Sequence, residues 1–289
     1  MTEKSPSSGY SEAEKLRQIL HDRLYDEGAI TLANKIAKCG EEVPLNCTGC
    51  GRRRVGRTRC DQRWCPVCQR ALAARTSLRY AAIAQECQWP LVCTFTTTHT
   101  KDSFLSPKEI RRAFTKLRRL RWWKAAVKGG VAAFELTDTG KGWHTHVHAL
   151  LDCRWLSVRE TPPAAHATAE AKRAKAKRSL REVSQQWTLC TGRKATVHAR
   201  RGRGGSAQIG SIAQEVLKYA VKGSDLVAMK GPVAPVIRSM AGSRLVVSWG
   251  NFYRHEAVKR PKPAPAMCQC GCSDWMLERQ VDALVRTLR

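Results

Sequence analysis

The stretch from Trp143 to Leu151 constrains the fold of this chain more than any other segment. It is rich in β-branched and aromatic residues and carries a histidine at every second position near its start. The preceding residues, Asp138–Gly142, are a turn signal of the kind that connects two strands. Because side chains alternate between the two faces of a strand, His144, His146 and His148 are expected on one face. The sequence therefore predicts a β-hairpin with three imidazoles on one surface.

Two of these three histidines can bind one metal ion. Neighbouring side chains on one face of a strand lie roughly 6.5–7 Å apart, whereas the outer pair is about 13 Å apart and needs a bulge to converge. The ligand pair is therefore either His144 and His146 or His146 and His148. We favour the second pair, because Val147 between its members is apolar and suits a buried opposite face. Thr145, between the members of the first pair, is a weaker core residue.

A third ligand is expected from the preceding strand, Val131–Thr137. If the hairpin loop is Thr139–Gly142, Glu135 pairs with His146, and paired residues share a face of the sheet. Two histidines and one carboxylate leave open coordination positions. This donor set suits Mn²⁺ or Mg²⁺ with a phosphate in the remaining positions. The alternative is a half-buried strand whose histidines lie on the surface and bind no metal.

A second segment, Ser211–Gly223, is predicted to be a helix that begins at its serine N-cap and ends at its glycine. Glu215, Tyr219 and Lys222 stand at positions i, i+4 and i+7, so they are expected on one helical face. Because a free tyrosine has a pKa of about 10, it needs a nearby cation and a polarised phosphate to act as a nucleophile. Glu215 is placed to act as a general base on water. The alternative is a surface network around a half-buried tyrosine.

Together these segments resemble the motifs of the HUH endonucleases, in which two histidines flank a bulky hydrophobic residue, here His146-Val147-His148. The chain is most similar to rolling-circle plasmid replication initiators, whose third motif has the spacing of Glu, Tyr and Lys found in Glu215–Lys222. Their first motif is a strand of Phe-x-Thr-x-Thr character, which Cys93–Thr98 resembles. The three motifs stand in the order found in the initiators, and the resemblance covers about 90–225. The third motif carries one tyrosine instead of two on the same helix, which is typical of the single-tyrosine subgroup.

The resemblance implies an α+β fold with an antiparallel sheet of about five strands flanked by helices. It also implies that Tyr219 attacks a phosphodiester at a replication origin, forms a 5′-phosphotyrosine and releases a 3′-OH that primes rolling-circle replication. The Glu135, His146 and His148 metal site then polarises the phosphate. Glu215 activates the water that ends the cycle, and Lys222 contacts the phosphate or the phenolate. A host helicase and a polymerase are the implied partners.

The charge of the chain indicates a polyanionic partner. Its 289 residues carry 51 Lys and Arg against 24 Asp and Glu, a formal net charge of +27. This excess goes beyond what solubility requires. Nucleic acid is favoured over a membrane, because no apolar run approaches the length of a spanning helix. The polar start of the chain lacks a secretion signal, so we expect a bacterial cytoplasmic protein that binds DNA and no membrane.

The positive charge is concentrated in a few segments. Arg111–Lys124 joins basic residues to Trp122 and Trp123, which suits unpaired bases, although the tryptophans can equally form the core side of an amphipathic helix. Lys172–Arg181 has the composition of a solvated helical face, and Arg200–Gly205 that of a flexible basic loop. DNA binding is therefore expected to weaken steeply with salt. The residues predicted to contact DNA are Arg118, Arg119, Arg121, Arg200, Arg201 and Arg203.

Thirteen cysteines without a secretion signal favour metal binding over disulfides. Two C-x-x-C pairs lie fourteen residues apart, close to the spacing of a zinc ribbon. The predicted structural zinc ligands are Cys47, Cys50, Cys65 and Cys68, with Cys60 and Cys39 as alternates. Cys60 competes because its spacing to the second pair resembles the cysteine pattern upstream of the initiator motifs. Two zinc ions that share six or more cysteines are also compatible with the pattern.

The sequence predicts four parts. Residues 1–38 are a disordered start and a helical segment, 39–70 are the cysteine-rich zinc module, and 71–260 are the HUH endonuclease domain. The last part, 261–289, contains a Pro-rich linker, a cysteine cluster and a terminal helix over 273–288. The cluster Cys268–Cys272 is a second candidate metal site that lacks a fourth ligand of its own and can borrow Cys39.

Three functions are compatible with these features. The first is a site-specific, strand-nicking replication initiator. The second is a single-tyrosine HUH transposase, which uses the same chemistry on paired transposon ends. The third is a zinc-ribbon DNA-binding regulator that does not cut DNA. Glu215 favours the initiator, because a transposase has less need of a terminating hydrolysis.

Overall fold

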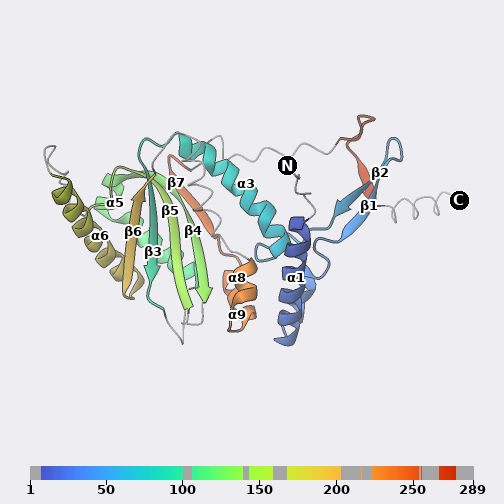
Figure 1. Ribbon diagram of the computed structural model, residues 1–289, viewed down its shortest axis with the longest axis horizontal. Helices are drawn as coiled ribbons and strands as arrows, with labels where there is room; N and C mark the ends of the chain where they lie inside the picture. The colour runs from blue at the N-terminus through green and yellow to red at the C-terminus, as the bar shows by residue number, and fades with distance from the viewer. Residues whose placement is uncertain are drawn as a thin grey trace. The chain divides into compact units, whose positions relative to one another are not determined.

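The computed structural model describes residues 8–99, 106–138, 143–158, 168–202, 216, 223–253, 255 and 267–277. The chain forms two compact units (Figure 1). The first combines residues 1–68 with 260–289, and the second contains 69–259. In the parts of the chain that the structure describes, no helix is long and apolar enough to cross a membrane.

The first unit begins with two helices, α1 (Ser8–Asp26) and α2 (Ile30–Ile36). They pack through the fully buried side chains of Leu20 and Leu24 on α1 and Ile36 on α2. Gly28 lies in the turn between the helices with φ +70°, a backbone conformation that glycine adopts without steric cost. The predicted helical segment is thus a helical hairpin.

The rest of the first unit is a three-stranded antiparallel sheet in the order β2-β1-β8. Its strands are β1 (Glu42–Cys47), β2 (Arg53–Arg57) and β8 (Trp275–Leu277). The terminal helix predicted over 273–288 is therefore wrong at β8, which pairs with the end of β1. Tertiary pairing overrides local propensity here, and the Arg54 guanidinium also lies 4.0 Å from the centre of the Trp275 ring.

This pairing also bears on the organisation of the chain. Residues 261–289 were expected to contain a Pro-rich linker, a cysteine cluster and a terminal helix. In the structure they belong to the same unit as residues 1–68. The cysteine module is thus assembled from two segments at opposite ends of the sequence.

The second unit contains a five-stranded antiparallel sheet in the order β6-β3-β5-β4-β7. Helices flank it, which confirms the predicted α+β class with a five-stranded antiparallel sheet. The strands are β3 (Pro90–Thr97), β4 (Val127–Asp138), β5 (Trp143–Cys153), β6 (Ala195–Arg201) and β7 (Val246–Gly250). The chain passes from the first unit into the second along α3 (Pro66–Gln85). The other described helices of the second unit are α4 (Pro107–Arg119), α5 (Arg121–Ala126), α6 (Ala169–Thr191), α8 (Gly223–Ala228) and α9 (Val233–Met240).

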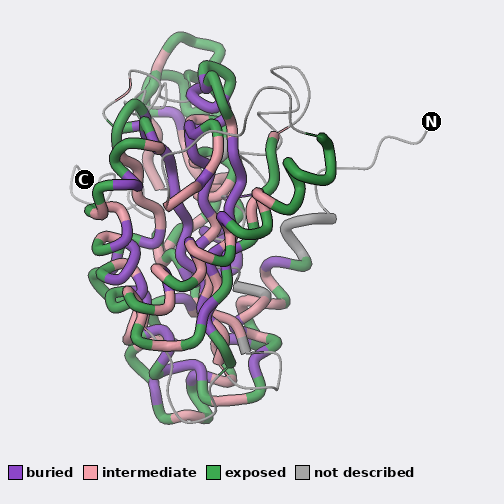
Figure 2. The backbone as a smooth tube through the Cα atoms, turned by 90° about the vertical axis from the view of Figure 1, so that its left-hand side faces the viewer, coloured by how far each residue is buried: buried purple, intermediate pink, exposed green. Residues whose placement is uncertain are grey.

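One face of this sheet carries the main aromatic core. Phe114 on α4 makes edge-to-face contacts with Phe95 and Phe134 of the sheet and with Trp187 of α6. Trp123 joins the same cluster and is 2% exposed. Trp122 and Trp123 therefore belong to the core, and the interpretation that they stack on DNA bases is wrong, because α5 turns both indoles inward. Figure 2 shows the buried residues concentrated along the strands.

The residues that the structure describes cover the opposite face of the sheet only in part. Residues of α3, Ile83 and Ala84 among them, pack with Val92, Val131 and Leu150 at one end of this face. The continuation of the same face carries the histidines of β5, because residues two apart on a strand share a face. The fold therefore presents the histidine row beside an apolar cover and on the side opposite the aromatic core.

Candidate functional site

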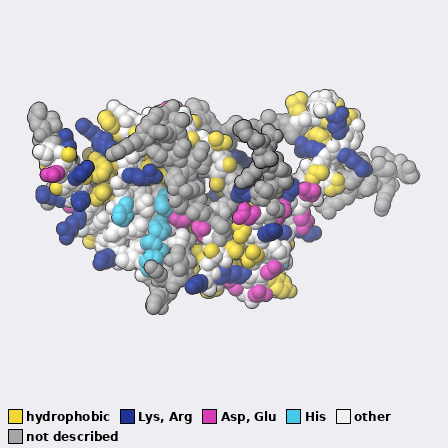
Figure 3. Space-filling model, in the orientation of Figure 1, with side chains coloured by type: hydrophobic (Ala, Val, Ile, Leu, Met, Phe, Trp, Pro, Cys, Tyr) yellow, Lys and Arg dark blue, Asp and Glu magenta, His cyan; other side chains and the backbone are white. Residues whose placement is uncertain are grey.

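The hairpin of β4 and β5 has the register expected from the sequence. Glu135 pairs with His146, Thr137 pairs with His144 and Asp138 pairs with Trp143. The loop between them lies outside the described residues. Glu135 and the histidines therefore share the face of the sheet that the aromatic core leaves open. Figure 3 shows the histidine side chains gathered on the surface of the sheet.

His148 is held by contacts from both neighbouring strands. Its Nε2 atom lies 2.9 Å from Oε2 of Glu135 on β4, and its Nδ1 atom lies 3.4 Å from Oγ1 of Thr94 on β3. The Glu135 carboxylate is 8% exposed, so this pair is largely shielded from solvent. A buried carboxylate in contact with an imidazole can orient the ring and can itself serve as a metal ligand.

The histidines form a continuous row along one edge of this face. Ring centroids are 4.0 Å apart for His99 and His144, 3.9 Å for His144 and His146, and 5.7 Å for His146 and His148. His99 was missed by the sequence analysis because it follows β3 and approaches β5 only in the folded sheet. His198 was missed too, although the register places it opposite Thr94 on the same face. The two-residue alternation of side chains along β6 is the sequence signal that could have placed His198 on this face.

Electrostatics keep the middle of this row neutral. Burial in the first place, and then repulsion from His144 and His148, lowers the pKa of His146 to about 3. Burial and repulsion from His99 also lower the pKa of His144. Neutral imidazole is the form that binds a metal ion. The Nδ1 atom of His146 is buried and has no hydrogen-bond partner among the described residues, so it is a polar atom that still needs a ligand or a donor.

As a set of three, the donor atoms of Glu135, His146 and His148 lie farther apart than the sulfur atoms within each cysteine group. Among the described residues, the groups of three or more donors within 4.8 Å of one another are two sets of four cysteines. On the histidine face, Glu135 and His148 are in direct contact and His146 lies beside them. The set of three therefore lacks the compact geometry of the cysteine groups.

The predicted nucleophile motif falls almost wholly outside the described residues. Glu215, Tyr219 and Lys222 are among those not described, as is Arg203. Val216, within the motif, is helical and 2% exposed, and it packs in the apolar cluster that covers the histidine-bearing face. The predicted end of this helix at Gly223 is not observed, because Gly223 is the first residue of α8.

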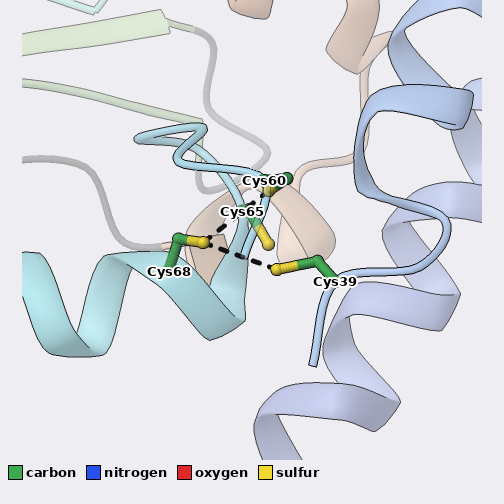
Figure 4. Close-up of side chains that lie close together, drawn as sticks. All are labelled: Cys39, Cys60, Cys65 and Cys68. Carbon is green, nitrogen blue, oxygen red and sulfur yellow. Dashed lines mark hydrogen bonds between the residues drawn. The ribbon is translucent and has the colours of Figure 1, made fainter. Parts of the chain in front are cut away.

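The first cysteine group consists of Cys39, Cys60, Cys65 and Cys68 (Figure 4). The Sγ atom of Cys68 lies 3.4 Å from that of Cys39 and 3.7 Å from that of Cys60. Sulfurs bound at about 2.3 Å at the corners of a tetrahedron lie about 3.8 Å apart, which these distances approach. Hydrogen bonds from the Cys39 and Cys60 thiols lower the pKa of Cys65 to about 4, which favours the metal-binding thiolate.

The second cysteine group consists of Cys47, Cys50, Cys268 and Cys270. Cys47 and Cys270 have Sγ atoms 3.5 Å apart, and Cys50 and Cys268 have Sγ atoms 3.6 Å apart. Cys272 lies beside this group, where its sulfur contacts Thr48 at 3.3 Å, but it is not a member. Both groups can hold a structural metal ion such as zinc.

These groups correct the predicted ligand set. Cys47, Cys50, Cys65 and Cys68 were expected to share one ion, and the structure assigns the two C-x-x-C pairs to different groups. The alternates Cys39 and Cys60 complete the group of the second pair. Cys268 and Cys270 complete the group of the first pair, and they do not borrow Cys39. The reason is the pairing of β8 with β1, which brings the C-terminal cysteines to the end of β1.

The predicted DNA-contacting arginines lie on two parts of the second unit. Arg119 and Arg121 are exposed near the junction of α4 and α5, and Arg118 is half-buried with its guanidinium 4.5 Å from the centre of the Trp249 ring. Arg200 and Arg201 are exposed at the end of β6, and the Arg201 guanidinium donates to the carbonyl of Arg154 at 2.9 Å. Arg118 and Arg119 lie near β7, whereas Arg200 and Arg201 are on β6 at the other end of the strand order.

No family model, curated protein or solved structure matches this chain. A functional interpretation therefore depends on the residues themselves. The histidine face, the two cysteine groups and the clustered arginines are the features that it has to explain.

Proposed function

We propose that the histidine face is the active site of a metal-dependent endonuclease that nicks single-stranded DNA at a replication origin. The observation that carries this proposal is the contact between Glu135 and His148, with His146 paired to Glu135 on the same face. A carboxylate and two imidazoles on one face of the sheet form a donor set that suits a divalent cation with open positions for a phosphate.

The proposed metal ligands are Glu135, His146 and His148, with His144 as an alternate for the third position. The contact of Glu135 with His148 favours the His146 and His148 pair over the His144 and His146 pair. A bound Mn²⁺ or Mg²⁺ supplies Lewis-acid polarisation of the scissile phosphate. Thr94 and Glu135 fix the ring of His148, so this side chain is oriented before any ion or substrate binds.

Tyr219 is the proposed nucleophile. Its phenolic oxygen forms a bond to the phosphorus, the bond from phosphorus to the 3′-oxygen breaks, and that oxygen takes up a proton to leave as the 3′-OH. Lys222 favours the phenolate, and Glu215 removes a proton from the water that later hydrolyses the phosphotyrosine. Support comes from Val216, which packs on the face that bears the histidines. Val216 stands three residues before Tyr219 in the sequence.

The two cysteine groups are proposed to hold one structural Zn²⁺ each. Four thiolates and no open position are typical of structural rather than catalytic zinc. The module they stabilise carries basic residues, Arg53, Arg54 and Arg57 among them, along the edge strand β2. With a net charge of +27, the protein is proposed to bind DNA through both units in the bacterial cytoplasm, where a host helicase and a polymerase extend the 3′-OH.

A non-catalytic zinc-ribbon regulator is the second candidate. It is favoured by the observation that the cysteine sets, and not the Glu135 and histidine set, are the compact donor groups among the described residues. Such a protein needs the basic surface and the zinc module but not Tyr219.

The test is covalent capture of DNA. The full-length protein is incubated with single-stranded origin DNA and Mn²⁺ and run on a denaturing gel. We expect a protein–DNA adduct that is lost in Tyr219→Phe and in Glu135→Gln, with zinc content unchanged in both variants. If origin DNA is bound in a salt-sensitive manner and no adduct forms, the regulator is the better description.

A further inference from the structure

An open pocket of about 650 Å³ lies at the β7 edge of the five-stranded sheet, between α4 and β7. Its volume is within the range of about 300–1,000 Å³ that small-molecule sites occupy. The polypeptide around it is strongly basic. Its cationic lining residues are Arg111, Arg112, Lys116, Arg118, Arg119 and Arg244.

No carboxylate is among the described residues that line this pocket, and none of its six cationic residues takes part in an ion pair with a described residue. Arg118 is the clearest case. Its Nε atom is buried without a hydrogen-bond partner in the described structure, and burial followed by repulsion from Arg119 lowers its pKa. The contact with the Trp249 ring offsets part of the cost of burying this guanidinium, which stays charged at neutral pH, and a bound anion would offset more of it.

Neither Glu135 nor the histidines of β5 line the pocket. Its lining includes Phe114 and Phe134 of the aromatic core, and Tyr80 and Val246 of the apolar cluster on the other face. The outer edge of β7 pairs with no described strand, so its backbone also borders the pocket. Tyr253, 55% exposed, adds an aromatic ring to the lining.

We propose that this pocket binds the phosphodiester backbone of single-stranded DNA, with a base stacked on Tyr253. Clustered guanidiniums match phosphate oxygens in a bidentate manner, and an exposed aromatic ring beside them is the pattern by which proteins bind single strands. The pocket is a concave recess rather than an extended surface, so it fits a flexible strand better than a duplex. The inference goes beyond the proposed cleavage, because it concerns a second contact that a non-cutting protein also retains.

The test measures binding apart from cleavage. A fluorescein-labelled oligothymidylate of about 15 nucleotides is titrated with the full-length Tyr219→Phe protein, and anisotropy is followed over a range of NaCl concentrations. In this background Arg119→Ala with Arg244→Ala removes two exposed cations from different sides of the pocket. We expect the Kd to rise about tenfold or more and the slope of log K against log salt to fall by about 1.4 in magnitude.

A matched control removes the same charge elsewhere. Arg173 and Lys177 are exposed on α6, which packs on β6 at the other end of the strand order. Arg173→Ala with Lys177→Ala should change the Kd by less than about threefold. Equal weakening by the two double variants would show that binding depends on diffuse charge, and the pocket assignment would be wrong.

Two further measurements test which ligand binds in the pocket. Tyr253→Ala should weaken oligothymidylate binding about fivefold or more while Tyr253→Phe preserves it, because stacking needs the ring and not the hydroxyl. Polyglutamate of matched charge should compete poorly, and effective competition would assign the pocket to an acidic polypeptide instead. Since none of these measurements requires strand cleavage, their failure is distinguishable from failure to form the Tyr219 adduct.

Discussion

The imidazole of His148 lies 2.9 Å from the carboxylate of Glu135 on the neighbouring strand, in a position that is largely shielded from solvent. Strand pairing alone creates this contact, because Glu135 is opposite His146 and His148 is the next residue on that face. The pair therefore places the two proposed metal ligands in a rigid position. A residue so placed on regular strands is held more precisely than one in a loop.

Removal of the Glu135 carboxylate should abolish metal-dependent activity with little loss of stability. Glu135→Gln preserves the shape of the side chain and its contact with His148, but it removes the charge that attracts a divalent cation. We expect Mn²⁺ affinity and adduct formation to fall on the order of 100-fold. Mn²⁺ binding is measured by electron paramagnetic resonance and adduct formation by denaturing gel. Wild-type Mn²⁺ affinity in this variant would remove Glu135 from the ligand set.

The two candidate histidine pairs can be separated by single substitutions. If His146 and His148 are the ligands, His148→Ala should reduce Mn²⁺ affinity on the order of 100-fold, and His144→Ala should change it less than about fivefold. His144 contacts His99 as well as His146, so the control also tests the rest of the row. A larger loss in His144→Ala than in His148→Ala would favour the other pair.

The purified protein should bind zinc at two independent sites. We expect about two zinc ions per chain by mass spectrometry of the purified protein. Cys39→Ser and Cys268→Ser should each lose one of them, because they belong to different groups. Cys272→Ser, beside the second group but outside it, should retain both and is the matched control. Loss of both ions in Cys39→Ser would mean that the groups are not independent.

Loss of the second zinc ion should release the C-terminal segment. Cys268 and Cys270, the short strand β8 and nearby contacts such as that of Trp275 with Arg54 hold this segment in its unit. Three strand residues bury too little apolar surface to stay paired on their own. Limited proteolysis should therefore cleave Cys268→Ser near its C-terminus at least about tenfold faster than it cleaves Cys272→Ser. Equal rates of cleavage would show that β8 stays paired without the ion.

The hairpin could be predicted because its signals are local. The turn signal in the sequence at 139–142 predicts the register, and the two-residue alternation then predicts which side chains share a face with Glu135. The five-stranded sheet followed from the family resemblance and from the mixture of strand-like and helix-like segments. The core role of Trp123 could not be decided, since an aromatic beside arginines suits DNA and core equally until its helix is oriented.

The cysteine grouping could not be predicted from spacing. The C-x-x-C pairs at Cys47 and Cys65 lie near each other in sequence, whereas Cys50 contacts Cys268 at a separation of 218 residues. Only the pairing of β8 with β1 brings these ligands together, and β8 is too short to show a strand pattern. The basic pocket is similar, because Arg244 joins the arginines of α4 only when β7 forms the edge of the sheet.

The N-terminus of α4 should contribute measurably to stability. Ser106 accepts a hydrogen bond from the Glu109 backbone N–H at 3.3 Å, and the Glu109 carboxylate accepts one from the Ser106 backbone N–H at 2.8 Å. Loss of such an N-cap costs about 1 kcal/mol. Ser106→Ala should lower the unfolding free energy by about that amount, as measured by urea titration with tryptophan fluorescence. An unchanged transition midpoint would show that the capping box does not stabilise α4.

The contribution of this capping box to the unfolding free energy should depend on pH. Hydrogen bonds from the Ser106 side chain and backbone lower the pKa of Glu109 below its ordinary value. A carboxylate whose pKa is lower in the folded state stabilises the protein above its unfolded pKa, and this contribution is lost as the pH falls through the folded pKa. The difference in stability between wild type and Glu109→Gln should therefore be largest near neutral pH and shrink on acidification. A difference that stays constant down to acid pH would mean that the charge of Glu109 contributes nothing to the cap.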